Sequence, residues 1–469
     1  MVGIRLSLRI VFATLLVCFG LAGTSLCQLP PEMAAKVDKI AADALAASGV
    51  PSASVVVVRD GKIAYSKAYG KARIETDRAA SPDMRYSIGS VSKQFTAAAL
   101  LMLQEQGKLS LDDKVGKYVR GLTRANDVTI RQLLSHTSGY QDYWPQDYVM
   151  PPMLKPTNAQ AIMDIWAKKP LDFEPGSKWQ YSNTNYVIAG VIIEKVSGMA
   201  LMEFLQKRIF APLKMSSVAD IDKARLGDTD PTGYFRYGIG PLRPAPKEGP
   251  GWLFAAGELA MTGQDLAKWD ISIIENSLLK PSSYVELGRE TLTLNGVGTR
   301  YGLGVSLGIS NSHHFLAHGG EVSGFTTQNT VFPEDKAAIV VLTNQDAADA
   351  AGTIAGGVSR VLFQTTFADA SAKADQAKAI FIGLQNGRVD RSLFTENANA
   401  YFSDQALKDF SSTLGPLGPP ASVVQTNSSL RGGMTGRSFN VTFSNGKSFR
   451  AWTFETADGK LEQYQVAPN

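Results

Sequence analysis

Residues 28–367 carry strand-like runs at both ends and helical runs between them. Near the start, "ASVVVVRDGKIAYSKAYGKA" holds two β-rich runs joined at Asp60-Gly61, a dipeptide typical of a hairpin turn. Near the end, "RYGLGVSLG", "HHFLAHGG", "TTQNTVF" and "AAIVVLTN" have strand character, whereas the apolar spacing from Val91 to about Lys280 is mostly helical. This order predicts an α+β fold, in which both ends form one antiparallel sheet flanked by helices and a mostly helical region is inserted. A ligand site is expected in the cleft between these two parts.

The character of the chain changes at Ala368. Two helical stretches come first, and then β-rich runs separated by the hairpin signals Asn445-Gly446 and Asp458-Gly459. Residues 368–469 are therefore predicted to form a separate, small α+β domain. This segment has no histidine and no recognisable chemical motif. A lid, a dimer contact and a cell-wall binding module all stay open as its role.

The first residues have the pattern of an export signal. Arg5 and Arg9 precede the apolar run "IVFATLLVCFGLAG", which is shorter than a membrane span. We expect residues 1–27 to be a signal peptide, with cleavage between Gly23 and Gln28, and the mature protein to be periplasmic or secreted. The alternative is an uncleaved N-terminal anchor, which is the one route to membrane association that we expect.

Charge and cysteine content exclude several classes of function. The chain has 47 Lys and Arg against 43 Asp and Glu, a net charge of +4 that falls to +2 without the two signal-segment arginines. Such a balance gives no reason to expect a nucleic-acid partner. The two cysteines, Cys18 and Cys27, lie in or beside the signal, so we expect no internal disulfide and no thiolate zinc site. His313 and His314 are adjacent in a predicted strand and point to opposite faces, so we expect no metal and no cofactor.

Ser90 and Lys93 form a Ser-x-x-Lys step at the start of a long amphipathic helix. Two other such pairs, Ser277/Lys280 and Ser444/Lys447, lie at a helix end and on a hairpin turn. Only the first places a hydroxyl and an amine one turn apart at a helix N-terminus, where positive potential favours an alkoxide nucleophile. Without further motifs, a capping serine followed by a solvated lysine is the favoured interpretation of the pattern.

Tyr181 and Asn183 form the second motif. Of the fifteen tyrosines, Tyr181 alone has an asparagine two positions later. A tyrosine near a lysine can exchange a proton with it and pass that proton to a leaving group, and Asn183 can hydrogen-bond both a lysine and a substrate carbonyl. The simpler interpretation is a loop tyrosine followed by a capping asparagine.

His318, Gly319 and Gly320 form the third motif, the one His-x-Gly in the chain. Glycines at a strand let a substrate approach the backbone closely, so we predict that these three residues bind substrate. The backbone N–H of Glu321 could face that of Ser90 across a carbonyl oxygen and form an oxyanion hole. A plain glycine turn beside a half-buried histidine is the alternative.

In this order, the three motifs resemble those of serine hydrolases grouped with class C β-lactamases, DD-peptidases and related esterases. Three further stretches fit the same family: "LLSHTSGY" (133–140), "AAGELAMTGQDLAKW" (255–269) and "YGLGV" (301–305). The resemblance covers about residues 35–364 and leaves the C-terminal domain unexplained. It implies the fold of β-lactamases and penicillin-binding transpeptidases.

The resemblance also implies roles for four residues. Ser90 would be the acylated nucleophile, and Lys93 would be its base or would help Tyr181 to be one. Tyr181 would protonate the leaving group and later activate water, and Asn183 would orient the substrate. For Lys93 to act near pH 7, burial must lower its pKa by about three units from roughly 10.4.

His318 departs from the family pattern. Many relatives carry there the lysine of a Lys-Thr-Gly motif, which helps to hold a substrate carboxylate. A histidine is mostly neutral at about pH 7 and supplies little charge. We therefore predict an exported hydrolase that cleaves an ester or amide of a small molecule or short peptide, such as a D-amino-acid peptide. A class C-type β-lactamase and a penicillin-binding-like sensor or pseudoenzyme remain the alternatives.

Overall fold

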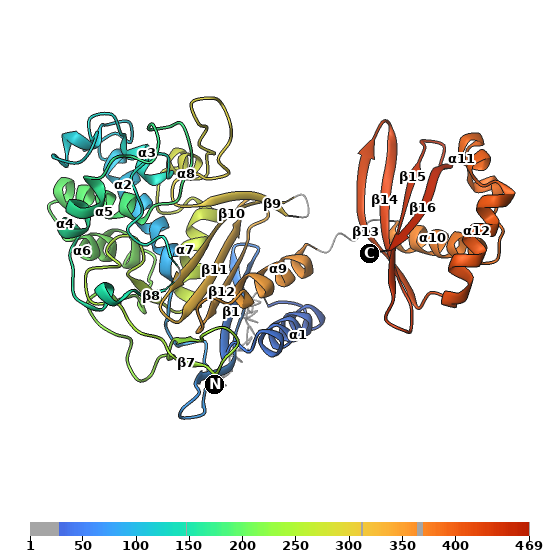
Figure 1. The fold of residues 1–469 in the computed structure, drawn as a ribbon, viewed down its shortest axis with the longest axis horizontal. Coiled ribbons are helices and arrows are strands. Elements are labelled where there is room, and N and C mark those ends of the chain that lie inside the picture. Colours follow the sequence, from blue (N-terminus) through green and yellow to red (C-terminus); the bar gives the residue numbers. More distant parts are fainter. Residues whose placement is uncertain (1–27, 147, 311–312, 364–368, 469) are drawn as a thin grey trace, which may run out of the picture. The chain divides into compact units, whose positions relative to one another are not determined.

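The computed structural model describes residues 28–146, 148–310, 313–363 and 369–468 (Figure 1). The chain divides into two compact units, of which the first ends at Phe363 and the second begins at Gln364. The expected signal peptide (1–27) and the expected domain boundary at 367/368 lie outside the described residues. Within the described ranges, every helix is too short or too polar to cross a bilayer.

A seven-stranded sheet forms the centre of the N-terminal unit. Its strand order is β3-β2-β1-β12-β11-β10-β9, and every neighbouring pair is antiparallel. The strands are β1 (Ser52–Arg59), β2 (Lys62–Arg73), β3 (Arg78–Ala79), β9 (Ser306–Ser310), β10 (His313–Val322), β11 (Phe325–Phe332) and β12 (Ala337–Thr343). β1 pairs with β12 in the register Val55↔Val341, so the two ends of the unit meet in one sheet. This confirms the predicted α+β fold class.

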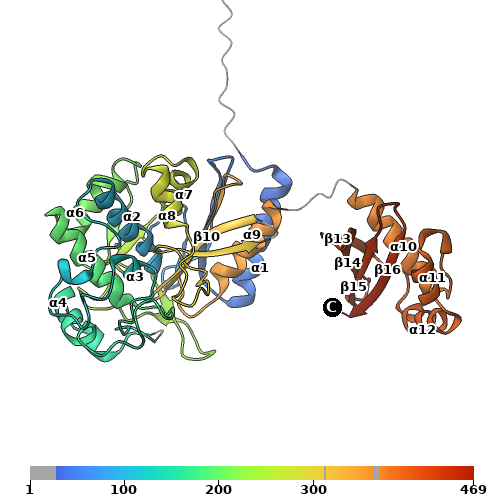
Figure 2. The ribbon, with the colours of Figure 1, turned by 90° about the horizontal axis from the view of Figure 1, so that it is seen from above.

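Both faces of this sheet are covered, because the central strands are apolar at successive positions. Val55, Val57 and Val341 belong to a core that they share with α1 (Pro31–Ser48) and α9 (Ala350–Leu362). Val56 and Leu342 face the other way, into the core of the helical region. In Figure 2 the strands accordingly stand between α1 and α9 on one side and the helical region on the other.

The inserted region, from Gly89 to Leu287, is helical in outline but interrupted. Its α-helices are α2 (Ser92–Glu105), α3 (Ile130–Leu134), α4 (Ala159–Ile162), α5 (Asn183–Ser197), α6 (Leu201–Leu205), α7 (Gly263–Glu275) and α8 (Pro281–Leu287). Short turns of 3-10 or π helix lie among them: η1 (Gly89–Val91), η2 (Val115–Lys117), η3 (Pro151–Leu154), η4 (Met163–Ala167) and η5 (Gln206–Phe210). Short strands also lie in this region, β5 (Ala219–Asp220), β6 (Tyr234–Phe235), β7 (Arg243–Pro244) and β8 (Leu259–Met261), and β4 (Tyr86–Ser87) comes directly before it. α2 is buried on all sides from Ser92 to Leu103, which makes it the central helix of the region.

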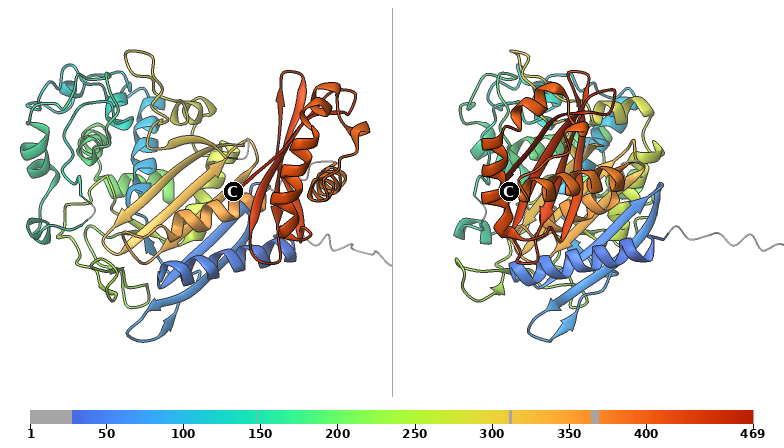
Figure 3. Two further views of the ribbon diagram at one scale, coloured as in Figure 1. Left: turned by 45° about the vertical axis from the view of Figure 1, so that its right-hand side comes forward. Right: turned by 90° about the vertical axis from the view of Figure 1, so that its right-hand side faces the viewer.

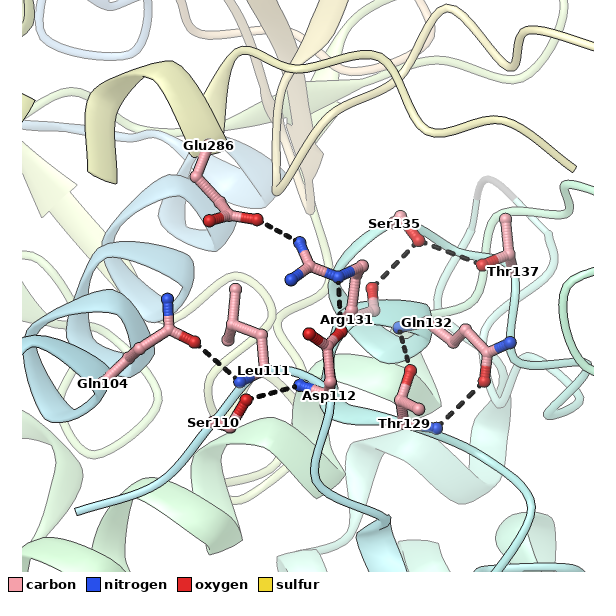
Figure 4. A network of polar contacts seen from close by, with 10 residues as sticks. All are labelled: Gln104, Ser110, Leu111, Asp112, Thr129, Arg131, Gln132, Ser135, Thr137 and Glu286. Carbon is pink, nitrogen blue, oxygen red and sulfur yellow. Dashed lines mark hydrogen bonds and ion pairs between the residues drawn. The ribbon is translucent and has the colours of Figure 1, made fainter. Parts of the chain in front are cut away.

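A polar network fixes the segment that leads into the candidate site (Figure 4). The Arg131 guanidinium in α3 forms ion pairs with Asp112 and with Glu286 of α8. Thr129 and Gln132 form a capping box at the start of the same helix. The side chain of Ser135 donates to the carbonyl of Arg131 at 2.9 Å, so this network holds the chain on its way to the "HTSGYQD" loop.

The C-terminal unit has helices followed by a four-stranded meander, as predicted (Figure 3). Its elements are α10 (Ala370–Gln385), η6 (Arg391–Leu393), α11 (Glu396–Tyr401), α12 (Asp404–Leu414), η7 (Gly415–Leu417), β13 (Ser422–Arg431), β14 (Met434–Thr442), β15 (Ser448–Glu455) and β16 (Leu461–Pro468). The helices pack against one face of the sheet, where Phe381, Leu384, Phe439 and Tyr464 share a core. The sheet order is β13-β14-β15-β16.

Candidate active site

Ser90 and Lys93 lie where η1 passes into α2, so the Ser-x-x-Lys step stands at the head of the central helix. Ser90 is partly exposed and lines a pocket, whereas Lys93 is completely buried. The Lys93 amine donates to Ser90 Oγ at 2.9 Å. The hydroxyl and the amine are therefore in direct contact, in the geometry that a nucleophile and its base require.

Burial lowers the pKa of Lys93 to about 7, and the nearby carboxyls of Asp142 and Glu258 oppose this shift. Glu258 is itself buried, which raises its pKa to about 8. Besides Ser90, the Lys93 amine donates to Asn183 Oδ1 and to the carbonyl of Ala256, each at 2.8 Å. A lysine with this pKa is partly neutral near pH 7 and can accept the proton of Ser90.

Tyr181 lies beside Ser90 and Lys93 from the loop that precedes α5. The Lys93 amine is 5.0 Å from the centre of its ring. Burial raises the pKa of Tyr181, and the neighbouring Ser90 hydroxyl partly offsets this rise. The Tyr181 phenol thus stays protonated at pH values at which the Lys93 amine is already neutral. This difference is compatible with Lys93 as a proton acceptor and Tyr181 as a proton donor in the free protein.

Asn183 is the first residue of α5, and Asp142 holds its amide in place. The backbone N–H of Asn183 donates to Asp142 Oδ1 at 2.9 Å, and its Nδ2 donates to Asp142 Oδ2 at 3.3 Å. Because Nδ2 is turned to the carboxylate, Oδ1 is left to accept from Lys93. Asp142 is not among the site residues predicted from the sequence. Its position two residues after the "LLSHTSGY" stretch was the available signal.

His318 lies in β10 on the wall of the same pocket, and its ring centre is 6.2 Å from that of Tyr181. Burial lowers its pKa to about 4, so the ring is neutral near pH 7. Nδ1 is 2.6 Å from the Gly319 carbonyl, to which it can only donate, so Nε2 accepts from the Tyr301 hydroxyl at 2.9 Å. Both ring nitrogens therefore have protein partners, and the ring presents neither a charge nor a spare N–H to a ligand.

The backbone of β10 lies directly against η1 at the predicted oxyanion hole. A Cβ added to Gly89 would be 2.7 Å from the backbone nitrogen of Glu321. A Cβ added to Gly320 would be 1.9 Å from the Ile88 carbonyl oxygen and 3.4 Å from the Ser90 nitrogen. Glycine at these two positions thus lets the segments that carry the Ser90 and Glu321 N–H groups come together.

A cavity of about 1430 Å³ opens over these residues. Besides Tyr181, its aromatic lining comes from Tyr143, Trp144, Tyr148, Phe235 and Tyr237. Among the described residues that line it, the acidic ones are Asp142, Glu321, Asp346 and Asp349, and the cation is Arg236. One amino group of the Arg236 guanidinium donates to Gln345 at 2.9 Å and to the carbonyls of Ser48 and Gly49. The cavity is therefore apolar and acidic rather than basic.

The other histidines take no part in this cavity. His136 is buried and accepts from the Ser182 N–H through Nδ1. Its ring lies tilted against the Tyr181 ring, with the two ring centres 4.3 Å apart, so it supports that ring. His313 and His314 contact Asp335 and Glu334 separately. Over the described parts of the chain, His, Cys, Asp and Glu side chains form no group of three or more with metal-binding geometry.

The model of the Beta-lactamase family matches residues 37–357 of this sequence. The chain belongs to this family. The match includes all three motifs, and it confirms the resemblance noted in the sequence. Members of this family are generally serine hydrolases.

Protein flp of Staphylococcus aureus (strain N315) is 27% identical over 325 residues, which are 68% of this chain and 64% of that protein. The chain thus spans less than two thirds of this curated relative. The octameric penicillin-binding protein homologue from Pyrococcus abyssi has the same fold, with a TM-score of 0.63, 22% identity, and coverage of 92% of this chain and 99% of that one. A D-stereospecific amidohydrolase from Streptomyces sp. aligns with a TM-score of 0.62 and 27% identity, covering 72% of this chain and 100% of that one.

Proposed function

We propose that this family member hydrolyses amides or esters of small acyl groups through an acyl-enzyme on Ser90. The observation that carries the proposal is the buried Lys93 amine, which is hydrogen-bonded to Ser90 Oγ and has a pKa lowered to about 7. In the first step Lys93 takes the Ser90 proton while Oγ bonds to the substrate carbonyl carbon. The N–H groups of Ser90 and Glu321 stabilise the oxyanion. Tyr181 then protonates the leaving group as its bond breaks, and water releases the acyl group by the reverse sequence.

The pocket favours substrates without a carboxylate near the scissile bond. His318 is neutral and both of its ring nitrogens are occupied, so it cannot replace a lysine that binds a carboxylate. The acidic lining repels an anion and attracts an ammonium group. An α-amino acid amide has such an ammonium group and an uncharged leaving group. The D-stereospecific amidohydrolase among the structural relatives supports the D configuration. We therefore propose D-aminoacyl amides and esters as the preferred substrates.

A panel of four substrates tests this proposal: D-phenylalanine amide, a D-Ala-D-Ala peptide, a p-nitrophenyl ester and nitrocefin. We expect kcat/KM for the D-amide to exceed that for the D-Ala-D-Ala peptide by at least about tenfold, the cost of one missing charged hydrogen bond. Fast nitrocefin turnover would instead support the β-lactamase alternative. A stable acyl adduct without turnover would support the sensor alternative.

We also propose that the protein acts outside the cytoplasm. The support is the basic and apolar pattern of residues 1–27. N-terminal sequencing of the protein recovered from the periplasm or the medium tests this, and the mature chain should begin between Gly23 and Gln28. Recovery of the intact chain from the cytoplasm would contradict it.

A further inference from the structure

The C-terminal unit has a second hollow, on the sheet face opposite its helices. It measures about 360 Å³, a volume within the range of about 300–1,000 Å³ that small-molecule sites occupy. Its lining comes from all four strands: Arg431, Ser438, Arg450, Trp452, Phe454, Gln463 and Gln465. Its described lining residues all belong to the C-terminal unit, and none of them is among the described residues that line the hydrolytic pocket.

Strand register places the side chains of this face in rows. Arg450, Trp452 and Phe454 alternate along β15, while the intervening Ala451 and Thr453 are buried on the helix side. Trp452 lies opposite Gln465 and Phe454 opposite Gln463 on β16. The surface thus consists of two aromatic rings, each beside a glutamine amide.

The Phe454 ring lies across β14, because Gly436 there has no side chain. A Cβ at Gly436 would be 2.9 Å from the Phe454 ring. The Arg431 guanidinium lies over this ring, 5.4 Å from its centre, and that of Arg450 lies 5.0 Å from the centre of the Trp452 ring. Each of the two aromatic rings therefore has an arginine guanidinium group over it, in a cation–π contact.

These two arginines lack ionic partners among the described residues 369–468. Arg437, on the helix side, pairs with Asp369 and Glu455. Arg431 and Arg450 are exposed and form no ion pair with a described carboxylate. The face has two unpaired cations and no carboxylate in its lining, which is complementary to an anionic ligand.

We propose that this face binds a glycan that carries carboxylates. Aromatic rings stack on the apolar faces of sugar rings, glutamine amides pair with hydroxyl and acetamido groups, and guanidinium groups bind carboxylates in a bidentate manner. Single-stranded nucleic acid also uses aromatic rings and cations, but it requires a positively charged groove. Residues 364–469 contain ten Lys and Arg against nine Asp and Glu, so the unit is nearly neutral. The proposal does not depend on the hydrolytic function.

Binding is tested with the full chain carrying Ser90→Ala, so that no probe is hydrolysed. The probes are purified peptidoglycan glycan strands, which carry lactyl carboxylates, neutral chitohexaose, and a 20-nucleotide single-stranded DNA. Calorimetry should show the acidic glycan binding at least tenfold more tightly than the other two. Tighter binding of the DNA, equal binding of both glycans, or no glycan binding would overturn the proposal.

Four variants assign the binding to this face. Trp452→Ala should weaken binding of the acidic glycan at least tenfold. The double variant Arg431→Gln/Arg450→Gln should weaken it similarly while leaving chitohexaose binding unchanged. Tyr401→Ala and Lys408→Gln alter an exposed aromatic ring and an exposed cation on α11 and α12, and they should change affinity less than twofold. If the face variants bind like the controls, the glycan site lies elsewhere and the proposal is wrong.

Discussion

Lys93 derives its chemistry from two opposing influences. Burial lowers the pKa of its amine to about 7, and the Asp142 carboxylate opposes this shift. The same carboxylate accepts from Asn183 Nδ2 and so holds Asn183 Oδ1 where it accepts from the Lys93 amine. Because Tyr181 has a raised pKa, kcat/KM should rise with pH through about 7 and stay level above it.

Asp142→Asn tests this balance directly. Without the carboxylate, the pKa of Lys93 falls further, so the acidic limb of the pH profile should move to lower pH. The maximal kcat should also fall by about tenfold, since the Asn183 amide is no longer fixed. The measurement is a pH profile of kcat/KM beside the exposed control Asp164→Asn, which should match the unaltered protein. An unmoved limb would mean that Asp142 does not act on Lys93.

The proposed function gives His318 a role in determining which charges the pocket accepts. In His318→Lys, a cation replaces a neutral ring, so substrates with a carboxylate should improve relative to D-aminoacyl amides. We expect the ratio of kcat/KM for the D-Ala-D-Ala peptide to that for the amide to rise about tenfold or more. His318→Gln, which adds no charge, is the matched control. If both variants shift the ratio equally, charge at position 318 does not set specificity.

The contact between β10 and η1 depends on Gly320. Its Cβ would overlap the Ile88 carbonyl oxygen, whereas a Cβ at the adjacent Gly319 would meet nothing closer than 3.8 Å. Gly320→Ala should therefore separate the two N–H groups of the proposed oxyanion hole and lower kcat by about 10²-fold or more. Gly320→Ala should also cost about 1–3 kcal/mol of stability through overpacking. Gly319→Ala should keep its melting temperature. Equal effects of the two changes would argue against this contact.

The long strands could be predicted because their sequences are apolar and end at turn residues, as at Asp60-Gly61. The short strands could not. Leu259–Met261 forms the centre of the sheet β4-β8-β5, yet three residues carry no periodicity, and the stretch resembles a helix start. The conformation of such short strands is determined by tertiary contacts, here the pairing of Tyr86 with Met261.

Four residues of the candidate site, Ser90, Lys93, Tyr181 and Asn183, could be identified from the sequence because each lies in a short motif. The structure brings them together around the Lys93 amine. Asp142 and Tyr301 could not be identified in this way. Each acts through a residue distant in the sequence, Asp142 on Asn183 and Tyr301 on His318. Only the folded chain brings these partners together.

The described residues that line the hydrolytic pocket run from Ser90 to Gly352, within the N-terminal unit. A chain of residues 28–363 should therefore keep kcat/KM for the D-amide within about threefold. The full chain should show two calorimetric transitions, since each unit has its own core. If the truncated chain stays folded but loses activity, the C-terminal unit completes the active site.

The most direct test is to locate the acyl group on the protein. Ser87, Ser90 and Ser92 lie within six residues of one another, so the label must be assigned by fragmentation. The protein is quenched during turnover of a D-aminoacyl ester, and also after treatment with a fluorophosphonate, and its peptides are analysed by mass spectrometry. We predict one adduct, on Ser90, and no adduct in Ser90→Ala. The activity of Ser90→Ala should be at least about 10³-fold lower than that of the unaltered protein. An adduct on Ser87 or Ser92, or full activity in Ser90→Ala, would contradict the account.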